Sequence, residues 1–485
     1  MEVFEKLYVG GEWVKPTGSA GIDVVSPSDE EVVGRVPEGT TADIDAAVTA
    51  ARRSFAAGKW RSLTPAERGA ILANVAEQIR TDMQDLAELI AKEAGSPVSW
   101  GLLGQVLAPT MILDYYAGLG NTYGFDTIEQ GMMGQVLVAR EPVGVVGAIS
   151  PWNVPLFSAV AKLAPALLAG CSVVFKPAPE TPLNALRLAQ YFERAGLPEG
   201  VLSVIPAGRE VGEHLVTHPG VDKITFTGST AAGKRIASLC GERIRRCGLE
   251  LGGKSAAILL DDVDLESALP MLVPNAFMNN GQACIAQTRI LAPRDRYDEV
   301  VDGIVDAVRK MVVGSALDAA TEVGPLVAGR QRDRVEGYIA IGQEEGAKVA
   351  VGGSRPAEQP KGFFVEPTVF VGVDNAMRIA REEIFGPVVA VIPHDGDEHA
   401  VALANDSDYG LCGSVYSADN ERGLAVARGV RTGTYMLNSS IPLDFATPFG
   451  GYKESGIGRE FGPDGLELFL EKKSIGLPFG YVPTV

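Results

Sequence analysis

Two residues of the chain have side chains suited to covalent catalysis. Cys284 follows the polar segment Asn279-Asn280-Gly281-Gln282-Ala283, and a cysteine in such a setting is a candidate nucleophile. Glu250 is flanked by leucines and followed by two glycines, so an apolar pocket around it would raise the pKa of its carboxyl group and suit it to general-base catalysis. Taken singly, each residue favours a structural explanation, because most cysteines are small core residues and most glutamates are solvated.

A glycine-rich turn, Gly228-Ser229-Thr230-Ala231-Ala232-Gly233, connects an expected strand, Lys223–Thr227, to an expected helix. Glycines at such a turn let the N-terminus of a helix approach a pyrophosphate group. The G-x-G-x-x-G pattern of ordinary dinucleotide-binding folds does not occur in the sequence. The turn alone is therefore a weak indication of a nucleotide site.

The segment from Gly248 to Ser255 formally matches the phosphate loop of ATPases, G-x-x-x-x-G-K-S. Such a loop needs a strand before it and a helix after it. Here we expect a charged segment, 242–246, before the motif and an apolar strand, 256–260, directly after it. Only seven residues separate Lys254 from Asp261, too few for a crossover helix between parallel strands. The context argues against an NTPase.

The four histidines offer little alternative chemistry. His214 and His218 have the i, i+4 spacing of metal ligands, but no H-E-x-x-H motif is formed and Pro219-Gly220 follows. We expect a helix end with cationic caps there, with a metal site as the weaker alternative. The G-x-S-x-G motif of serine hydrolases is also missing from the sequence. No metal ion is expected.

The composition is that of a globular protein of two or three domains. The chain has 485 residues, 46% hydrophobic and 21% charged, and its 61 acidic and 43 basic residues give a net charge of −18. This balance repels nucleic acids and anionic membrane surfaces. The five cysteines form no C-x-x-C pair, and the N-terminal residues do not resemble a signal peptide. We expect a cytoplasmic protein with no nucleic-acid or membrane partner.

Short apolar runs alternate with amphipathic stretches along the chain, which predicts parallel, doubly wound sheets with helices on both faces. Thr64-Pro65-Ala66-Glu67 is a strong helix start, and we expect one helix from there to Gly95. From residue 143 the alternation becomes regular, with strands expected at 143–150, 173–176, 201–205 and 223–227. A second alternating stretch begins at Ser255.

Loops after these strands should carry the chemistry, because ligands bind at the carboxyl ends of parallel strands. The loops are distinctive: Ser150-Pro151-Trp152-Asn153-Val154-Pro155, then Lys176-Pro177, then Phe226-Thr227-Gly228-Ser229-Thr230.

Together with these loops, the two candidate residues resemble the aldehyde dehydrogenase superfamily over essentially the whole chain. The matching segments, in order, are P-W-N-x-P, F-T-G-S-T, L-E-L-G-G-K, G-Q-x-C, E-I-F-G-P, and P-F-G-G with G-R-E. The resemblance implies Cys284 as nucleophile, Glu250 as general base and Asn153 as donor to the oxyanion. It also implies that Lys162 and Glu460 are candidates for relaying a proton or for supporting the catalytic residues.

The same resemblance implies a nicotinamide cofactor, NAD, with NADP not excluded. In it Lys176 contacts the adenosine ribose, Glu383 holds the nicotinamide ribose and Phe385 packs on the cofactor. The full set of cofactor-binding residues that it implies is Ser150, Pro151, Trp152, Lys176, Pro179, Phe226, Gly228, Ser229, Gly233, Leu251, Glu383 and Phe385.

Two positions depart from the family pattern. The family often has a glutamate three residues after the ribose-contacting lysine, where this chain has Pro179 followed by Glu180. The residues flanking Cys284 are Ala283 and Ile285, so no adjacent thiol is available as a disulfide partner. The first departure removes the carboxylate that usually repels a 2′-phosphate, but proline adds no donor that would attract one. We therefore expect only a modest preference for NAD, with some NADP activity.

At the level of fold, the resemblance implies an α/β protein with two doubly wound open-sheet domains and a small oligomerisation hairpin. We assign 1–123 and 143–252 to an NAD-binding domain and 253–455 to a catalytic domain. The oligomerisation element comprises 124–142 and 470–485, and a homotetramer or homodimer is expected.

The implied reaction is the oxidation of an aldehyde to a carboxylic acid through a cysteine thiohemiacetal and a thioester. Two alternatives remain: a CoA-acylating aldehyde dehydrogenase, and a homologue repurposed for binding or as a structural protein, as lens crystallins are. Phe157, Tyr435 and Phe445 are candidates for the substrate entrance and suggest an apolar aldehyde.

Overall fold

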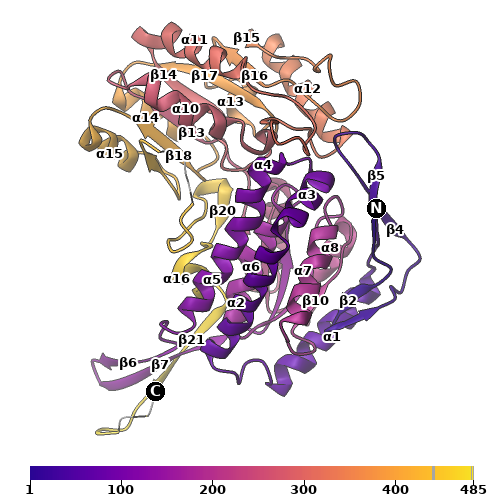
Figure 1. Ribbon diagram of the computed structural model, residues 1–485. Helices are drawn as coiled ribbons and strands as arrows, with labels where there is room; N and C mark the ends of the chain where they lie inside the picture. The colour runs from indigo at the N-terminus through magenta and orange to yellow at the C-terminus, as the bar shows by residue number, and fades with distance from the viewer. Residues whose placement is uncertain (440–442, 482, 484–485) are drawn as a thin grey trace.

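The computed structural model describes residues 1–439, 443–481 and 483. Figure 1 shows two bodies, one above the other, each built around its own sheet. The lower body contains an eight-stranded sheet in the order β20-β12-β11-β8-β9-β10-β2-β3, whose central strands β12 to β10 are parallel. Its strands are β2 (Leu7–Val9), β3 (Glu12–Val14), β8 (Val145–Ile149), β9 (Ser172–Lys176), β10 (Leu202–Val204), β11 (Lys223–Thr227), β12 (Arg246–Glu250) and β20 (Gly456–Ile457).

Helices cover both faces of this sheet because its strands are apolar on both sides. Val146 and Ala148 of β8 pack with α2, α3 and α5 to α7, whereas Val145 and Ile149 of the same strand pack with α1, α8 and α9. The helices are α1 (Thr41–Ala57), α2 (Pro65–Thr81), α3 (Met83–Ala94), α4 (Val98–Trp100), α5 (Ala108–Leu119), α6 (Pro155–Ala169), α7 (Leu183–Arg194), α8 (Arg209–Thr217), α9 (Thr230–Gly241) and α16 (Gly462–Glu467). A π-helix, η1 (Gly101–Leu107), joins α4 to α5.

The single helix expected from Thr64 to Gly95 is wrong, because the chain breaks at Asp82 into α2 and α3. Asp82 has φ −98° and ψ 17°, and its carboxylate accepts a hydrogen bond of 2.8 Å from the Tyr191 hydroxyl. That tertiary contact is invisible in the local sequence. The predicted capping box between Thr64 and Glu67 is present at the start of α2.

The upper body contains a seven-stranded sheet in the order β15-β16-β17-β14-β13-β18-β19, parallel except for β15. Its strands are β13 (Ala256–Leu259), β14 (Arg289–Pro293), β15 (Lys348–Val351), β16 (Thr368–Val371), β17 (Val388–His394), β18 (Gly413–Tyr416) and β19 (Met436–Leu437). The helical elements around it are α10 (Leu265–Ala276), η2 (Met278–Gly281), η3 (Arg294–Arg296), α11 (Tyr297–Val308), α12 (Gly329–Glu344), α13 (Arg378–Arg381), α14 (Asp397–Asn405) and α15 (Asn420–Gly429), with η4 (Lys453–Ser455) near the lower body.

The mixed α/β fold with two largely parallel sheets agrees with the predicted fold class. The strand expected after the phosphate-loop match is confirmed as β13, so no helix follows the loop; in addition, the first residues of the match lie within the strand β12. The domain boundaries proposed from the sequence stay a prediction, although the strands of each sheet fall within them, apart from β20.

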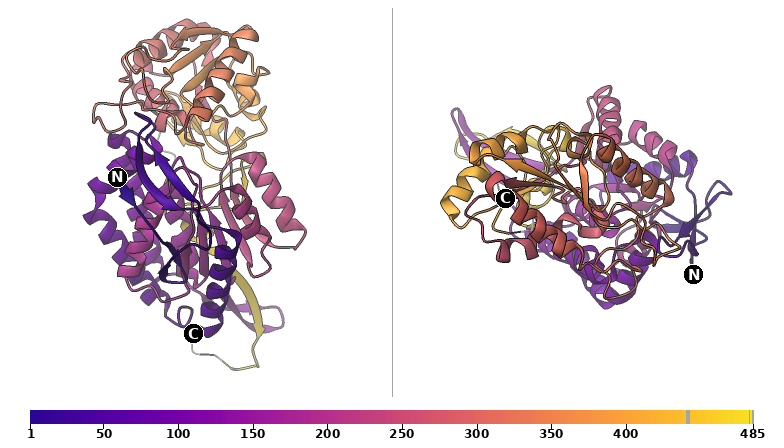
Figure 2. Two further views of the ribbon diagram at one scale, coloured as in Figure 1. Left: turned by 90° about the vertical axis from the view of Figure 1, so that its right-hand side faces the viewer. Right: turned by 90° about the horizontal axis from the view of Figure 1, so that it is seen from above.

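A three-stranded antiparallel sheet projects from the lower body (Figures 1 and 2). It consists of the hairpin β6 (Asp126–Gly131) and β7 (Gly134–Pro142), with β21 (Leu470–Gly476) paired along β7. Met132 and Met133 at the hairpin tip are fully exposed. A small sheet near the N-terminus contains β1 (Glu2–Val3), β5 (Val32–Pro37) and β4 (Gly21–Val25).

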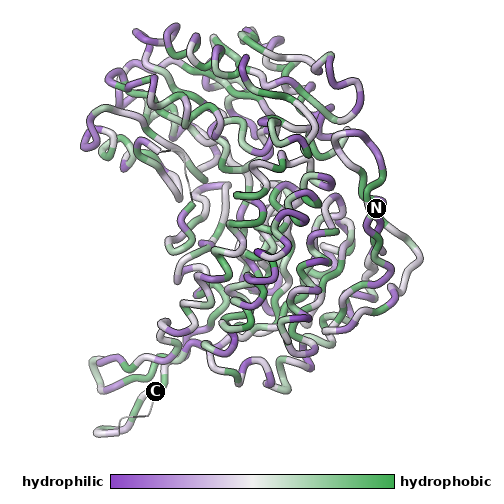
Figure 3. The backbone as a smooth tube through the Cα atoms, viewed as in Figure 1, coloured by the Kyte–Doolittle hydropathy of each residue, from purple (hydrophilic) through white to green (hydrophobic). Residues whose placement is uncertain are grey.

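Apolar segments gather in the strands and inner helices, and polar segments lie at the periphery (Figure 3). Among the described residues, no helix is long and apolar enough to cross a membrane.

Candidate active site

Two adjoining cavities lie at the carboxyl ends of β8, β9, β11 and β12. The first, of about 500 Å³, is lined by eight of the residues expected to bind cofactor: Ser150, Pro151, Trp152, Lys176, Pro179, Phe226, Gly228 and Ser229. The second, of about 290 Å³, shares Pro151, Trp152 and Thr227–Ser229 with the first, and it reaches Asn153, Leu251, Cys284, Glu383 and Phe385. The structure therefore brings Asn153, Cys284 and all of the expected cofactor-binding residues except Gly233 to these two cavities, whereas Glu250, Lys162 and Glu460 line neither of them.

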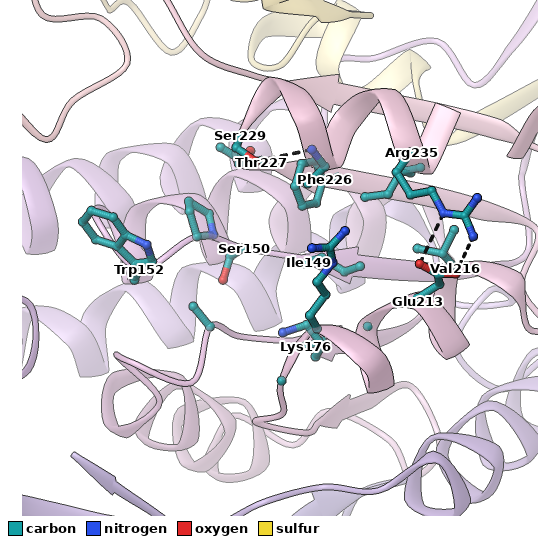
Figure 4. Close-up of a pocket in the computed structure, with 18 of the residues that line it drawn as sticks. Ile149, Ser150, Trp152, Lys176, Glu213, Val216, Phe226, Thr227, Ser229 and Arg235 are labelled. Atoms are coloured by element: carbon teal, nitrogen blue, oxygen red, sulfur yellow. Dashed lines mark hydrogen bonds and ion pairs between the residues drawn. The ribbon is translucent and has the colours of Figure 1, made fainter. Parts of the chain in front are cut away.

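Helices α8 and α9 form a wall of the larger cavity that the sequence analysis missed. Figure 4 shows Trp152 toward one end of this cavity and the ion pair between Arg235 and Glu213 at the other. Apolar residues on the inner sides of the two helices add to this wall: Val216, Ile236 and Leu239. Their helical spacing indicates an apolar helix face, but it cannot distinguish a face that packs in the core from one that lines a pocket.

Two glycines act through close packing. A Cβ on Gly228 would lie 2.5 Å from the Phe226 ring. Gly233 lines neither cavity; a Cβ there would lie 2.4 Å from Leu251, so its hydrogen side chain lets α9 pack against that residue.

Lys176 is held in the wall of the larger cavity by two carbonyl groups. Its Nζ donates to Pro177 O at 3.0 Å and to Ala207 O at 2.8 Å, and burial lowers its pKa to about 8. An ammonium group has three hydrogens, so one donor remains for a ligand.

Glu180, the acidic residue after Pro179, also lines the larger cavity. Its carboxylate forms an ion pair with Arg330 at the start of α12, which belongs to the upper body and lines the smaller cavity. The pair therefore joins the two bodies beside the cavities. Sequence reasoning placed Glu180 near a ribose but did not identify this partner.

Cys284 lies between η2 and β14, after three consecutive left-handed residues, Asn279, Asn280 and Gly281, with φ of 50°, 62° and 71°. The Asn280 side chain stabilises this turn by donating to Gly95 O and Pro325 O, each at 2.8 Å, and by accepting from Gly324 N at 2.6 Å. Burial raises the pKa of the Cys284 thiol to about 12, and the negative charges of Glu383 and Glu250 add to the effect. The thiol is thus protonated at neutral pH until a base acts on it.

Asn153 projects its amide toward the turn that carries Cys284. Its Nδ2 donates to Gln282 O at 2.7 Å, which fixes the orientation of the amide group. An amide nitrogen has two hydrogens, so one remains free to meet an oxyanion.

Glu250 ends β12 and is buried. Its Oε2 has no hydrogen-bond partner in the described part of the chain, and burial followed by the charge of Glu460 raises its pKa well above the ordinary value. Lys162 and Arg459 act in the opposite direction. A buried carboxylate of this kind is a stronger base than a solvated one.

Lys162, which is buried, and Glu460, which is partly buried, form an ion pair of 2.6 Å next to this carboxylate, and Lys162 also donates to Thr227 Oγ1 at 2.5 Å. The pair connects α6 to the segment that follows β20. Because Glu460 contributes to the raised pKa of Glu250, a change in the ion pair will change the pKa of this candidate base.

Glu383 and Phe385 form the wall of the smaller cavity that comes from the upper body. Glu383 Oε1 accepts from Gly253 N at 2.9 Å, and burial raises the pKa of this carboxyl to about 7. Phe385 has a left-handed φ of 64° and its ring meets Trp152 edge-on at 5.4 Å. Gln331 of α12, which sequence reasoning missed, secures the turn by donating to Phe385 O at 2.8 Å.

The entrance candidates separate into two places. Phe157, Phe445 and Phe461 form an aromatic cluster with ring centroids 5.3–6.1 Å apart, and Cys284 packs against the same apolar core. Tyr435 instead packs inside the upper sheet, where its hydroxyl donates to Ser414 O at 3.0 Å, so it is not part of this cluster.

His214 and His218 share a carboxylate: their Nε2 atoms lie 2.6 and 3.4 Å from Asp45 Oδ1 of α1. Within the described residues, no group of three or more histidine, cysteine, aspartate or glutamate side chains could hold a metal ion.

A two-body α/β fold in which a thiol and an amide line one of two adjoining cavities, with a buried carboxyl acting on the thiol, defines a class of enzyme. Residues 13–475 match the model of the aldehyde dehydrogenase family, and the chain belongs to that family. It is an aldehyde oxidoreductase.

Individual relatives match over nearly the full length. A geranial dehydrogenase of Castellaniella defragrans is 45% identical over 474 residues, covering 98% of each chain. A Mycobacterium tuberculosis aldehyde dehydrogenase solved with NAD+ has 50% identity and a TM-score of 0.98, covering 99% of this chain and 100% of its own. Aldehyde dehydrogenase C of Pseudomonas syringae, solved with NAD+ and octanal as a cysteine-to-alanine variant, has 41% identity and a TM-score of 0.95, covering 99% and 98%.

Proposed function

We propose that this enzyme oxidises an apolar aldehyde to the carboxylic acid with NAD+, using Cys284 as the nucleophile. The observation that carries the proposal is that Cys284 and Asn153 line one cavity, while the buried Glu250 lies close enough for its charge to act on the Cys284 thiol. Each of these side chains comes from a different element, so the arrangement is a property of the fold.

The residues present suit a dinucleotide. The two cavities adjoin, and the buried Ser150 hydroxyl on the wall of the larger one has no hydrogen-bond partner in the described part of the chain. Lys176 and Glu383 would hold the two riboses. When bound, NAD+ supplies an acceptor for the hydride of the substrate.

The chain's own groups act in sequence on the aldehyde. A base removes the proton of the Cys284 thiol, because its raised pKa leaves little thiolate at neutral pH. The thiolate adds to the carbonyl carbon, and the free hydrogen of the Asn153 amide, together with the Cys284 N–H, meets the oxyanion. Loss of hydride from this adduct leaves a thioester on Cys284.

Glu250 then accepts a proton from water, and the resulting hydroxide attacks the thioester to release the acid. In the Lys162–Glu460 pair, Lys162 stabilises the charged form of Glu250 and Glu460 opposes it, and the pair offers a route for the proton. A carboxylate in this position favours hydrolysis over transfer to CoA, because transfer to a thiol needs no activated water.

The charges that line the larger cavity favour NAD+ over NADP+, which carries an additional 2′-phosphate. Pro179 provides no carboxylate against a 2′-phosphate, but Glu180 lines the same cavity and is held there by Arg330. Since Arg330 neutralises part of that charge, the repulsion is incomplete, and a modest preference is expected.

The substrate class is argued from the aromatic cluster of Phe157, Phe445 and Phe461, in which Phe157 and Phe445 are partly exposed apolar rings and Phe461 is buried behind them. The relatives that act on geranial or bind octanal handle aldehydes of this kind.

We further place the protein in the cytoplasm as a homodimer or homotetramer. The projecting hairpin with exposed Met132 and Met133, and the strand β21 alongside it, are suited to pairing with a second copy. Mass measurement of the native protein tests this.

The experiment for the reaction is a rate measurement on a panel of aliphatic, aromatic and terpenoid aldehydes, with and without CoA, with identification of the product. Free acid formed at a rate independent of CoA supports the proposal. An acyl-CoA product, or turnover that survives in the Cys284→Ala variant, would refute it.

A further inference from the structure

Asn153 is held by two buried amide side chains from separate parts of the chain. Gln105 Nε2 donates to Asn153 O at 2.8 Å, and Asn279 Nδ2 donates to the same oxygen at 2.9 Å. With the bond from Asn153 Nδ2 to Gln282 O, three hydrogen bonds define the position of this residue.

Gln105 reaches this carbonyl from the π-helix η1. A π-turn holds one more residue than an α-turn and changes the direction of the side chains that follow it, and such turns occur often at functional sites. Gln105 is completely buried, whereas Leu103, two residues earlier, is exposed. The π-helical irregularity therefore contains Gln105, the residue whose side chain contacts the Asn153 carbonyl.

The amide side chains of Gln105 and Asn279 each lower the stability of the fold through one unpaired buried oxygen. Gln105 Oε1 and Asn279 Oδ1 are both buried without a hydrogen-bond partner among the described residues. A buried acceptor without a partner is unfavourable, and an apolar side chain of the same volume would remove that penalty. What an apolar side chain could not supply is the donor to Asn153 O.

We infer that Gln105 is a positioning residue for the oxyanion donor, acting together with Asn279. By fixing the carbonyl of Asn153 it restricts rotation of the backbone there, and so keeps the free amide hydrogen aimed at the developing oxyanion. This inference rests on the proposed role of Asn153. Displacements of about 1 Å in a catalytic group can cost about 10²-fold in rate.

The test is a set of single-turnover measurements of nicotinamide reduction on the full-length enzyme. Gln105→Met keeps the side-chain volume, removes the donor and also removes the unpaired Oε1. The expected result is a hydride-transfer rate about 10- to 100-fold lower, with an unchanged Kd for NAD+ and a Tm that is equal or higher. Gln78→Met is the matched control: Gln78 also donates to a backbone carbonyl, Tyr191 O at 3.2 Å, and also has a buried, unpaired Oε1.

A double-mutant cycle with Asn153→Ala separates positioning from general structural support. If Gln105 acts through Asn153, the double variant transfers hydride no more slowly than Asn153→Ala alone. An equal additional loss in the double variant, or a Gln105→Met rate within twofold of wild type, overturns the inference. An Asn153→Ala variant with a normal rate would instead overturn the proposed role of Asn153 itself.

A second substitution covers the case in which Gln105→Met fails to fold. In Gln105→Glu, only the protonated carboxyl can donate to Asn153 O, so its rate relative to wild type should fall as the pH rises. A pH-independent ratio of the two rates would contradict the inference.

Discussion

Replacement of Glu250 by glutamine separates the two chemical steps that the site must perform. The carboxylate is lost but the volume is kept, so no base remains at this position to activate water. Loss of a general base lowers the rate of its step by about 10²–10⁴. We therefore expect the thioester to accumulate and the steady-state rate to fall by that factor.

The structure also indicates why the first step should survive. With a pKa of about 12, only about one Cys284 thiol in 10⁴ is ionised at pH 8. The charge of Glu250 is one cause of that raised pKa, so a neutral glutamine favours the thiolate. The loss of a proton acceptor is thus partly offset by easier ionisation of the thiol.

Rapid-mixing measurements of nicotinamide reduction test this reasoning. Glu250→Gln should give a burst approaching one reduced cofactor per active site, followed by slow turnover, and alkylation of Cys284 should become faster at pH 8. Cys284→Ala serves as the control in both assays, since Cys247 is also partly accessible. A variant with neither burst nor turnover, and with slower alkylation, would refute the reasoning and place Glu250 on activation of the cysteine.

Four further outcomes are expected. Cys284→Ala should show no detectable nicotinamide reduction and an unchanged Tm; turnover above a few per cent of wild type would contradict its role. Glu250→Gln should raise the Tm by an amount that grows as the pH rises above about 5, because the unfolded carboxyl ionises near its ordinary pKa whereas the pKa of the folded one is raised; a pH-independent difference would count against the raised pKa of Glu250. The ratio of kcat/KM for NAD+ over NADP+ should modestly exceed one and should fall in Glu180→Gln; a clear preference of the wild type for NADP+ would disprove the charge argument. Phe157→Ala should raise the KM for aliphatic aldehydes of medium length more than that for acetaldehyde, and an equal change for both would exclude the aromatic cluster from substrate binding.

Much of the fold and of the candidate site was predictable because the information is local. The alternation of strand and helix from residue 143 predicted the order of elements, since a strand apolar on both faces requires helices on both sides. The P-W-N-x-P, L-E-L-G-G-K and G-Q-x-C segments led to Asn153, Glu250 and Cys284 through resemblance, and the structure places Asn153 and Cys284 on one cavity, with the charge of Glu250 acting on the thiol.

What only the tertiary structure decided are contacts between residues distant in sequence. Asp82, at the break between α2 and α3, accepts a hydrogen bond from Tyr191. The partner of Glu180 is Arg330 in the other body, and Tyr435 packs with the upper sheet rather than beside Phe157. The raised pKa of Glu250 depends on burial and on Glu460, which is more than two hundred residues away. Sequence periodicity reports which face of an element is apolar, but burial, pairing and electrostatic coupling arise from packing between elements, and these are properties of the folded chain alone.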